Sequence, residues 1–148
     1  MGIWEWALAA YARPGVAQAC LTLQDLHGQN VCLLLWAVWA ETAEPAQLAE
    51  AADLARRWEA LAAAPLRAVR RALKAPTPPV ADAQREALRE AVRATELRAE
   101  RVLLETLQAL RGRPPGGASA LQALRAAAAA WGEPVPEAAL AALAAALH

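Results

Sequence analysis

Prolines and glycines interrupt this 148-residue chain at short intervals, and the stretches between them consist largely of alanine and leucine. Both of these residues are strong helix formers, and 43 alanines with 23 leucines make up most of the apolar residues. The β-branched residues that favour strands are scarce. The sequence therefore predicts an all-α fold, a single-domain helical bundle (1–148) of about seven to eight helices with short connections rich in proline and glycine.

The interrupting residues also set the bounds of the expected helices. Gly28 suits the left-handed position after a helix, while Asn30 and Ser119 are suitable N-caps for the helices that follow them. Pro65 either kinks a helix or separates two, and the run 112–117 is expected to end the longest one. The expected helices span 4–12, 16–27, 31–43, 44–64, 66–75, 83–111, 119–131 and 136–147.

These helices group into three parts of the expected domain. The first part, 1–75, is rich in tryptophan; the second, 76–80, is an extended linker stiffened by prolines. The third part, 81–148, holds the long helix and two alanine-rich helices. Within the first part, the stretch 31–43 is apolar nearly all round and is expected at the centre of the bundle. The long helix is expected to pack through residues spaced by three or four: Leu88, Val92, Thr95, Ala99, Val102, Thr106 and Leu110.

Four of the six tryptophans fall within the first 39 residues, at positions 4, 6, 36 and 39. A buried indole N–H needs an acceptor, so polar residues nearby become candidate partners. Asp25 lies near the end of a helix, where the helix dipole disfavours negative charge. It is either a structural acceptor, which is the commoner case, or a general base or ligand-orienting carboxylate. The candidate ligand-binding residues are Asp25, Gln24, Trp4, Trp36, Trp39 and Tyr11.

A second candidate surface is basic. Arg67, Arg70, Arg71 and Lys74 fall at i, i+3, i+4 and i+7, on one face of the helix expected over 66–75. Four cations in two turns suit an anionic partner surface, whether acidic protein, RNA phosphate or lipid head group. A solvated face without a partner is the more frequent meaning of such a stripe.

Composition narrows the function classes. The net charge of zero makes nucleic acid an unlikely partner. The longest strongly apolar run, 31–40, is half as long as a membrane span, and no signal-peptide pattern opens the chain. Cys20 and Cys32 are too few for a disulfide framework, which predicts reduced thiols in the cytoplasm. Ser119 is the only serine, and the metal-binding pairs C-x-x-C and H-x-x-x-H are missing, so we expect no catalytic residue, metal or cofactor.

The N-terminal residues also carry a resemblance. The motif W-x-W-A-L from Trp4 to Leu8, followed by Tyr11, P-G-V at 14–16 and C-L-x-L-Q-D-x-x-G at 20–28, resembles a small uncharacterised family of proteobacterial proteins. The likeness covers about the first 40 residues. It implies a helical cytoplasmic protein defined by this segment, and it supplies no reaction. The family usually has asparagine at the position of Cys32, which argues against a required thiol there.

The leading functional hypothesis is a non-enzymatic protein-interaction or assembly module, with a second copy of the chain among its candidate partners. The alternative is a binder of an apolar or aromatic small molecule, held in a Trp-lined pocket between the first three helices. A pocket of roughly 300 Å³ or more lined by the indoles would favour this alternative. A third hypothesis is an enzyme that uses Asp25 as a general base.

Overall fold

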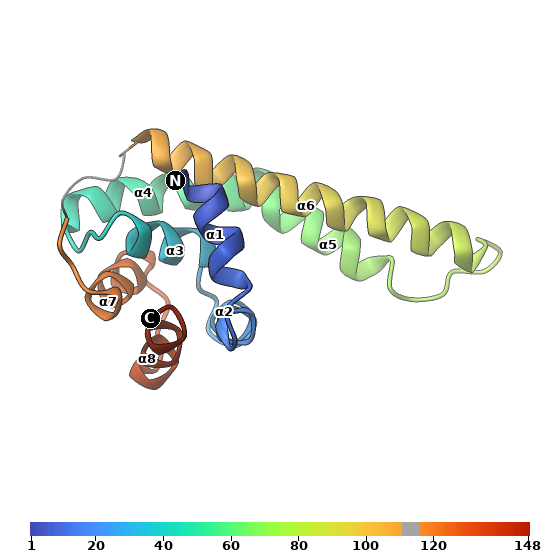
Figure 1. Cartoon of the computed structure of the whole chain (residues 1–148). Helices are drawn as coiled ribbons and strands as arrows, with labels where there is room; N and C mark the ends of the chain where they lie inside the picture. Colours follow the sequence, from blue (N-terminus) through green and yellow to red (C-terminus); the bar gives the residue numbers. More distant parts are fainter. Residues whose placement is uncertain (111–115) are drawn as a thin grey trace. The chain divides into compact units, whose positions relative to one another are not determined.

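The computed structural model describes residues 1–110 and 116–148, and helices account for all of their regular secondary structure (Figure 1). The prediction of an all-α fold is confirmed. Arg111 and the run 112–115, expected to end the long helix, lie outside the described residues. The elements are α1 (Ile3–Tyr11), α2 (Val16–Asp25), α3 (Val31–Trp39), α4 (Pro45–Trp58), the π-helical segment η1 (Glu59–Ala63), α5 (Ala64–Ala72), α6 (Asp82–Leu110), α7 (Ala120–Trp131) and α8 (Glu137–Ala146).

The chain divides into two compact units, which are described separately. Unit 1 comprises residues 1–55 and 104–148, and unit 2 comprises residues 56–103. Unit 1 contains α1, α2, α3, α7, α8 and most of α4. Unit 2 contains η1, α5 and most of α6, and we refer to it as the hairpin.

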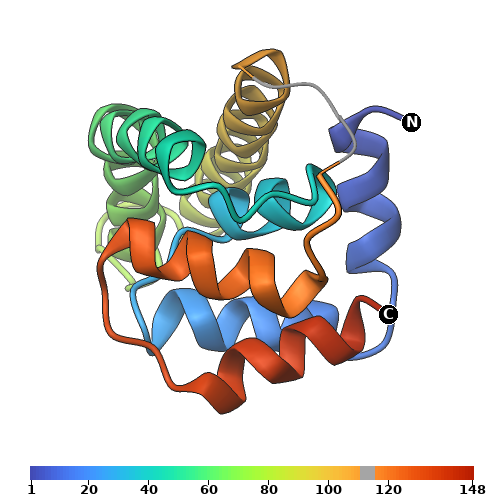
Figure 2. The ribbon, with the colours of Figure 1, turned by 90° about the vertical axis from the view of Figure 1, so that its left-hand side faces the viewer.

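Helix α3 is the centre of unit 1, as its apolar sequence predicts. Seven of its nine residues are buried, and Trp36 is 0% exposed. It packs against α1, α2 and α7, while α8 contacts α2 and α7 (Figure 2). A helix that is apolar on every side gains most when neighbours cover it all round, because each buried side chain contributes roughly 1.5–3 kcal/mol.

Polar contacts fix the loops around this core. The indole N–H of Trp131 donates to the Gly28 carbonyl at 2.7 Å, and the side-chain amide of Gln29 donates to the Glu133 carbonyl at 2.8 Å. Both bonds join the loop after α2 to the end of α7 and the residues that follow it. Gly116 lies so close to another loop that a Cβ there would be 2.0 Å from the Glu41 carbonyl oxygen. Glycine is required at this close approach.

The helix boundaries follow the expected caps. The Asn30 side chain accepts from the Leu33 N–H at 2.9 Å, and Ser119 forms a capping box with Gln122. Gly28 has the expected positive φ of 62°. The helices expected over 16–27 and 31–43 are shorter than predicted, ending at Asp25 and Trp39, because terminal turns are the least certain part of a helix prediction.

In the hairpin, α5 and α6 run side by side (Figure 1), joined by several hydrogen bonds. Pro65 stands at the first turn of α5 directly after η1, so helical structure continues from α4 into α5 through a π-helical segment. The linker expected to be extended over 76–80 instead forms a turn, with a hydrogen bond of 2.8 Å from the Val80 N–H to the Thr77 carbonyl and a cis peptide between Pro78 and Pro79.

The prediction of which residues of α6 are buried is wrong at most positions. Of the predicted positions, only Ala99 is buried and Val92 half-buried, whereas Leu88 is 55% and Val102 46% exposed. The most shielded positions of α6 within the hairpin recur instead at intervals of three and four residues on another face: Arg85, Arg89, Val92, Glu96, Ala99 and Leu103. Sequence reasoning assigned the apolar residues to the interior, but three of these six side chains are charged.

Replacing Trp36 with alanine should destabilise unit 1 by about 3–5 kcal/mol, because the deletion leaves a large cavity in a core without exposed surface. Denaturant unfolding monitored by circular dichroism measures this loss. Leu8→Ala is the matched control, because Leu8 is 51% exposed and its truncation should cost about 0.5 kcal/mol or less. Equal losses in the two variants would contradict a core centred on α3.

Candidate functional site

The two tryptophans of α3 are core residues. Trp36 is 0% and Trp39 3% exposed, and within the described residues neither indole N–H has an acceptor. Asn30, a polar residue at the N-terminal end of the same helix, accepts from the Leu33 N–H instead. An unpartnered buried donor carries a desolvation penalty of about 1–3 kcal/mol. Shape and apolar area therefore hold these rings in place.

The other residues of the candidate ligand site lie on α1 and α2. Tyr11 is 40% exposed and Trp4 is half-buried, both on α1. Gln24 is half-buried and Asp25 is exposed, at the last turn of α2. An exposed carboxylate at a helix end lacks the water-excluded surroundings that catalytic bases usually have. The enzymatic role of Asp25 gains no support from this placement.

A small cavity adjoins one indole. It has a volume of about 150 Å³ and is lined by Trp36, Gln47, Glu50 and Leu110; we call it the Trp36 cavity. None of the other candidate ligand-binding residues lines it. Its volume is half the lower limit of about 300 Å³ for ordinary ligand pockets. The cavity accepts a group of about six carbon atoms, as an engineered protein cavity of similar size does.

The basic stripe is divided between two environments. Arg67 forms an ion pair with Glu59 at 2.8 Å, and Arg70 forms one with Glu96 at 2.5 Å. These four side chains are only 16–28% exposed. By contrast Arg71 and Lys74 are exposed. At least two of the predicted docking residues, Arg67 and Arg70, thus serve contacts within the hairpin.

Arg85 is a structural residue that sequence reasoning missed. It is 7% exposed, and its guanidinium donates to the carbonyls of Leu73 and Lys74 at 2.9 and 3.2 Å. It also pairs with Glu86 at 2.8 Å and with Asp82 at 3.2 Å. A cation that binds the last carbonyls of α5 complements the negative end of that helix. No local pattern reveals this role, because the carbonyls lie eleven and twelve residues earlier in the chain.

The outer surface of the hairpin combines positive charge with apolar side chains. The hairpin contains 11 basic and 6 acidic residues, a net charge of +5. Because the net charge of the whole chain is zero, unit 1 carries −5. Lys74, Arg93 and Arg98 are exposed and form no ion pair with any described residue. Six large apolar residues of the hairpin are also exposed, by 46–75%: Leu61, Val69, Val80, Leu88, Leu97 and Val102.

Carboxylates crowd together beside the two inner arginines. Desolvation raises the pKa of Glu100, the charge of Glu96 raises it further, and the charge of Arg67 opposes both. Burial lowers the pKa of Arg67, but the hydrogen bond and charge of Glu59 outweigh that effect and raise it overall.

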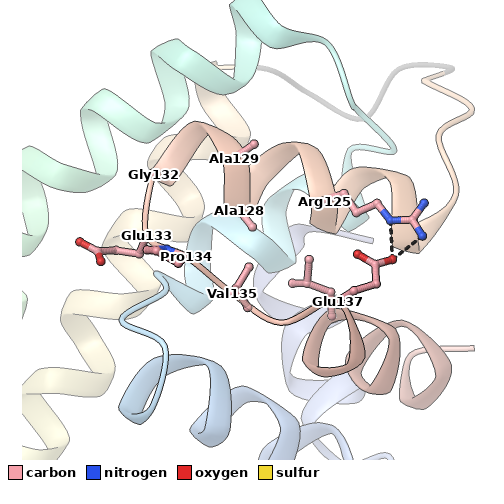
Figure 3. A pocket seen from close by; sticks show the side chains of 9 residues that line it. Arg125, Ala128, Ala129, Gly132, Glu133, Pro134, Val135 and Glu137 are labelled. Atoms are coloured by element: carbon pink, nitrogen blue, oxygen red, sulfur yellow. Dashed lines mark hydrogen bonds and ion pairs between the residues drawn. The ribbon is translucent and has the colours of Figure 1, made fainter.

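A pocket of about 340 Å³ lies beside the loop from α7 to α8 (Figure 3). Three charged residues line it: Arg125 and Glu137, which form an ion pair with each other and are both more than half exposed, and Glu133. The hydrogen bond from Arg125 lowers the pKa of Glu137. Apart from these three residues the lining consists of alanine, glycine, proline, valine and leucine, which offer a ligand few groups for specific recognition.

Thiols and metal-binding side chains are the remaining groups that could support chemistry. Cys20 and Cys32 form no disulfide, and the described residues hold no group of three or more side chains suited to a metal ion. Among residues 1–110 and 116–148, no helix combines the length and the apolar character needed to cross a membrane.

Comparison with known proteins identifies the family. A family model described as "Protein of unknown function (DUF2390)" matches residues 2–107, well over half of the chain. The chain belongs to this family. The DUF2390 match extends far beyond the first 40 residues that carry the resemblance, through the hairpin and into the last part of α6, while α7 and α8 lie outside it. The searches of curated proteins and of solved structures find no match.

In this DUF2390 protein, Arg70→Glu should lower the free energy of unfolding by about 2–3 kcal/mol, because it replaces a partly buried ion pair with two neighbouring carboxylates. Adding Glu96→Arg should restore part of the loss by rebuilding the pair in reverse. Chemical denaturation of the two single variants and the double variant gives the coupling energy. Additive losses would contradict a direct interaction.

Glu100→Gln should stabilise the protein slightly at neutral pH. The pKa of Glu100 is raised from 4.5, so ionising this carboxyl costs the folded state more than the unfolded state. The free energy of unfolding therefore falls as the pH rises from the ordinary glutamate pKa to the raised one. Glutamine removes that penalty, and the benefit should disappear below about pH 4. Thermal unfolding of Glu100→Gln and of the control Glu90→Gln, from about pH 4 to neutral pH, measures the change in stability that each variant causes. A gain that persists at low pH would contradict this origin.

Proposed function

We propose that this protein is a non-enzymatic interaction module whose hairpin binds an acidic protein surface. The observation that carries the proposal is the composition of the hairpin exterior, where a net charge of +5 accompanies six exposed large apolar residues. Protein interfaces typically combine an apolar centre with charged groups that orient the partner. We further propose a cytoplasmic protein of proteobacterial origin, in keeping with its N-terminal resemblance and with two cysteines that form no disulfide.

The internal ion pairs explain why apolar residues remain outside. A hairpin of two helices encloses one narrow seam, and charged residues such as Arg70, Arg85 and Glu96 occupy much of it. Leucines and valines on the other faces therefore remain exposed. Large apolar residues and cations are thus exposed on the same unit, a combination that supports protein binding over simple solvation.

The small-molecule hypothesis has weaker support. The Trp36 cavity is too small for an ordinary ligand pocket, and the larger pocket beside the α7–α8 loop contains no indole among its lining residues. The general-base hypothesis relies on Asp25, which is exposed. Neither alternative has an observation that favours it over protein binding.

A pull-down from native lysate tests the proposal. The variant Lys74→Gln/Arg93→Gln/Arg98→Gln neutralises three exposed cations without touching the internal ion pairs. We expect it to lose the acidic proteins that the wild-type chain retains, with bound proteins quantified by mass spectrometry.

The matched control changes the net charge equally but leaves the hairpin intact. Ala17→Glu/Ala49→Glu/Ala142→Glu adds three negative charges at exposed positions of unit 1. This control should retain the same proteins as the wild type. The proposal fails if the neutralised hairpin still captures them.

A further inference from the structure

Helix α6 presents a second row of residues to solvent, apart from its seam face. The row follows intervals of three and four residues, and each member is exposed: Leu88, Ala91, Thr95, Arg98 and Val102. We refer to these five residues as the outer row. Their spacing repeats every seven residues, as in the contact face of a coiled coil, with Ala91 and Arg98 at the d positions and the other three at the a positions. The outer row lies wholly within unit 2.

The side chains of the outer row suit the packing of another helix. Leu88 and Val102, at its two ends, are large apolar residues that are 55% and 46% exposed. Ala91 and Thr95 lie between them and are small, so a partner helix can approach α6 closely there. From Leu88 to Val102 the row extends over about 21 Å, or roughly four helical turns.

The charge along the outer row is of one sign. Arg98 is exposed and forms no ion pair with any described residue. The e and g positions beside the row hold residues 87, 92, 94, 99 and 101, which include Arg101 but no acidic residue. The acidic residues of α6 in the hairpin fall on the remaining positions of the repeat, at 82, 86, 90, 96 and 100. A helix that packs on the outer row therefore meets positive charge at these positions.

This charge pattern decides against a second copy of the chain as the occupant. Parallel pairing of two outer rows would place Arg98 against Arg98, and antiparallel pairing would still bring together two faces without a carboxylate. Like charges in contact destabilise a pair of helices. An acidic amphipathic helix instead supplies apolar side chains for the two ends of the row and a carboxylate for Arg98.

We propose that the outer row docks an amphipathic helix of an acidic protein, with a carboxylate of that helix paired to Arg98. The inference deepens the proposed function and rests on it, because it names the face of the hairpin that makes contact and the secondary structure of the partner. The partner packs as a third helix beside α5 and α6. Its apolar side chains cover Leu88 and Val102, and its carboxylate gives specificity to the contact.

Binding of a synthetic peptide to the full chain tests the inference. The acidic probe is a helical peptide of three heptads with leucine at its a and d positions, except for one glutamate at the central d position, and with glutamate at its e and g positions. Repulsion between the glutamates keeps this peptide monomeric. The basic probe has lysine at every glutamate position. Fluorescence anisotropy should show binding of the acidic probe to the wild type and at least tenfold weaker binding of the basic probe.

The chain offers a matched control for the apolar contact. Leu88→Glu should weaken binding of the acidic probe at least tenfold. Leu97 is 51% exposed and lies nine residues further on, on the opposite side of the same helix. Leu97→Glu changes the net charge equally and should leave binding of the acidic probe within threefold of the wild type.

A second matched pair tests the ionic contact. Arg98→Glu should weaken binding of the acidic probe at least tenfold, whereas Arg93→Glu, at an exposed arginine of the f position opposite the outer row, should leave it within threefold. A third probe, with lysine in place of the central glutamate alone, should bind Arg98→Glu more tightly than the acidic probe does. Circular dichroism of every variant confirms that it is folded before its binding is interpreted.

The inference is overturned if the wild type does not bind the acidic probe, or if either control variant weakens binding as much as its counterpart in the outer row. In that case the proposed function still stands if neutralising Lys74, Arg93 and Arg98 together releases acidic proteins in the lysate experiment. Capture that survives this neutralisation would refute the proposed function itself.

Discussion

A hairpin of two helices can enclose only one seam between them, and in this protein charged side chains occupy much of that seam. Arg70 pairs with Glu96, and the buried Arg85 binds the last carbonyls of the neighbouring helix. Burying a charge is costly unless it is paired, and these contacts pair the charges of Arg70 and Arg85. The consequence is that leucine and valine side chains remain on the outer faces. The proposed interaction function follows from this distribution.

Unit 1 is stabilised differently. Its centre is a helix apolar on nearly every side, enclosed by α1, α2 and α7, with α8 packed on two of the surrounding helices. Apolar burial needs no exact partner geometry, so Trp36 and Trp39 remain in the core even though no residue in the described part of the chain accepts from their N–H groups. One chain thus combines a core stabilised by apolar area with a hairpin stabilised largely by ion pairs and hydrogen bonds.

Local sequence signals predicted much of the fold. Asn30, Ser119 and Gly28 act at helix ends through contacts within a few residues, and such signals can be read without tertiary information. The packing face of α6 could not be predicted in this way, because apolar periodicity selected Leu88 and Val102 while the structure shields Arg85 and Glu96. The internal ion pairs of Arg67 and Arg70 could not be predicted either, since their acidic partners lie 8 and 26 residues away.

Native-state hydrogen exchange with increasing denaturant tests most directly whether the two units are stabilised by different interactions. The account predicts that amides of α3 exchange only through global unfolding, whereas amides of α5 exchange through a separate opening of lower free energy. Few buried apolar contacts support α5, which contains no fully buried residue. Equal protection of α3 and α5, with the same denaturant dependence, would contradict the account.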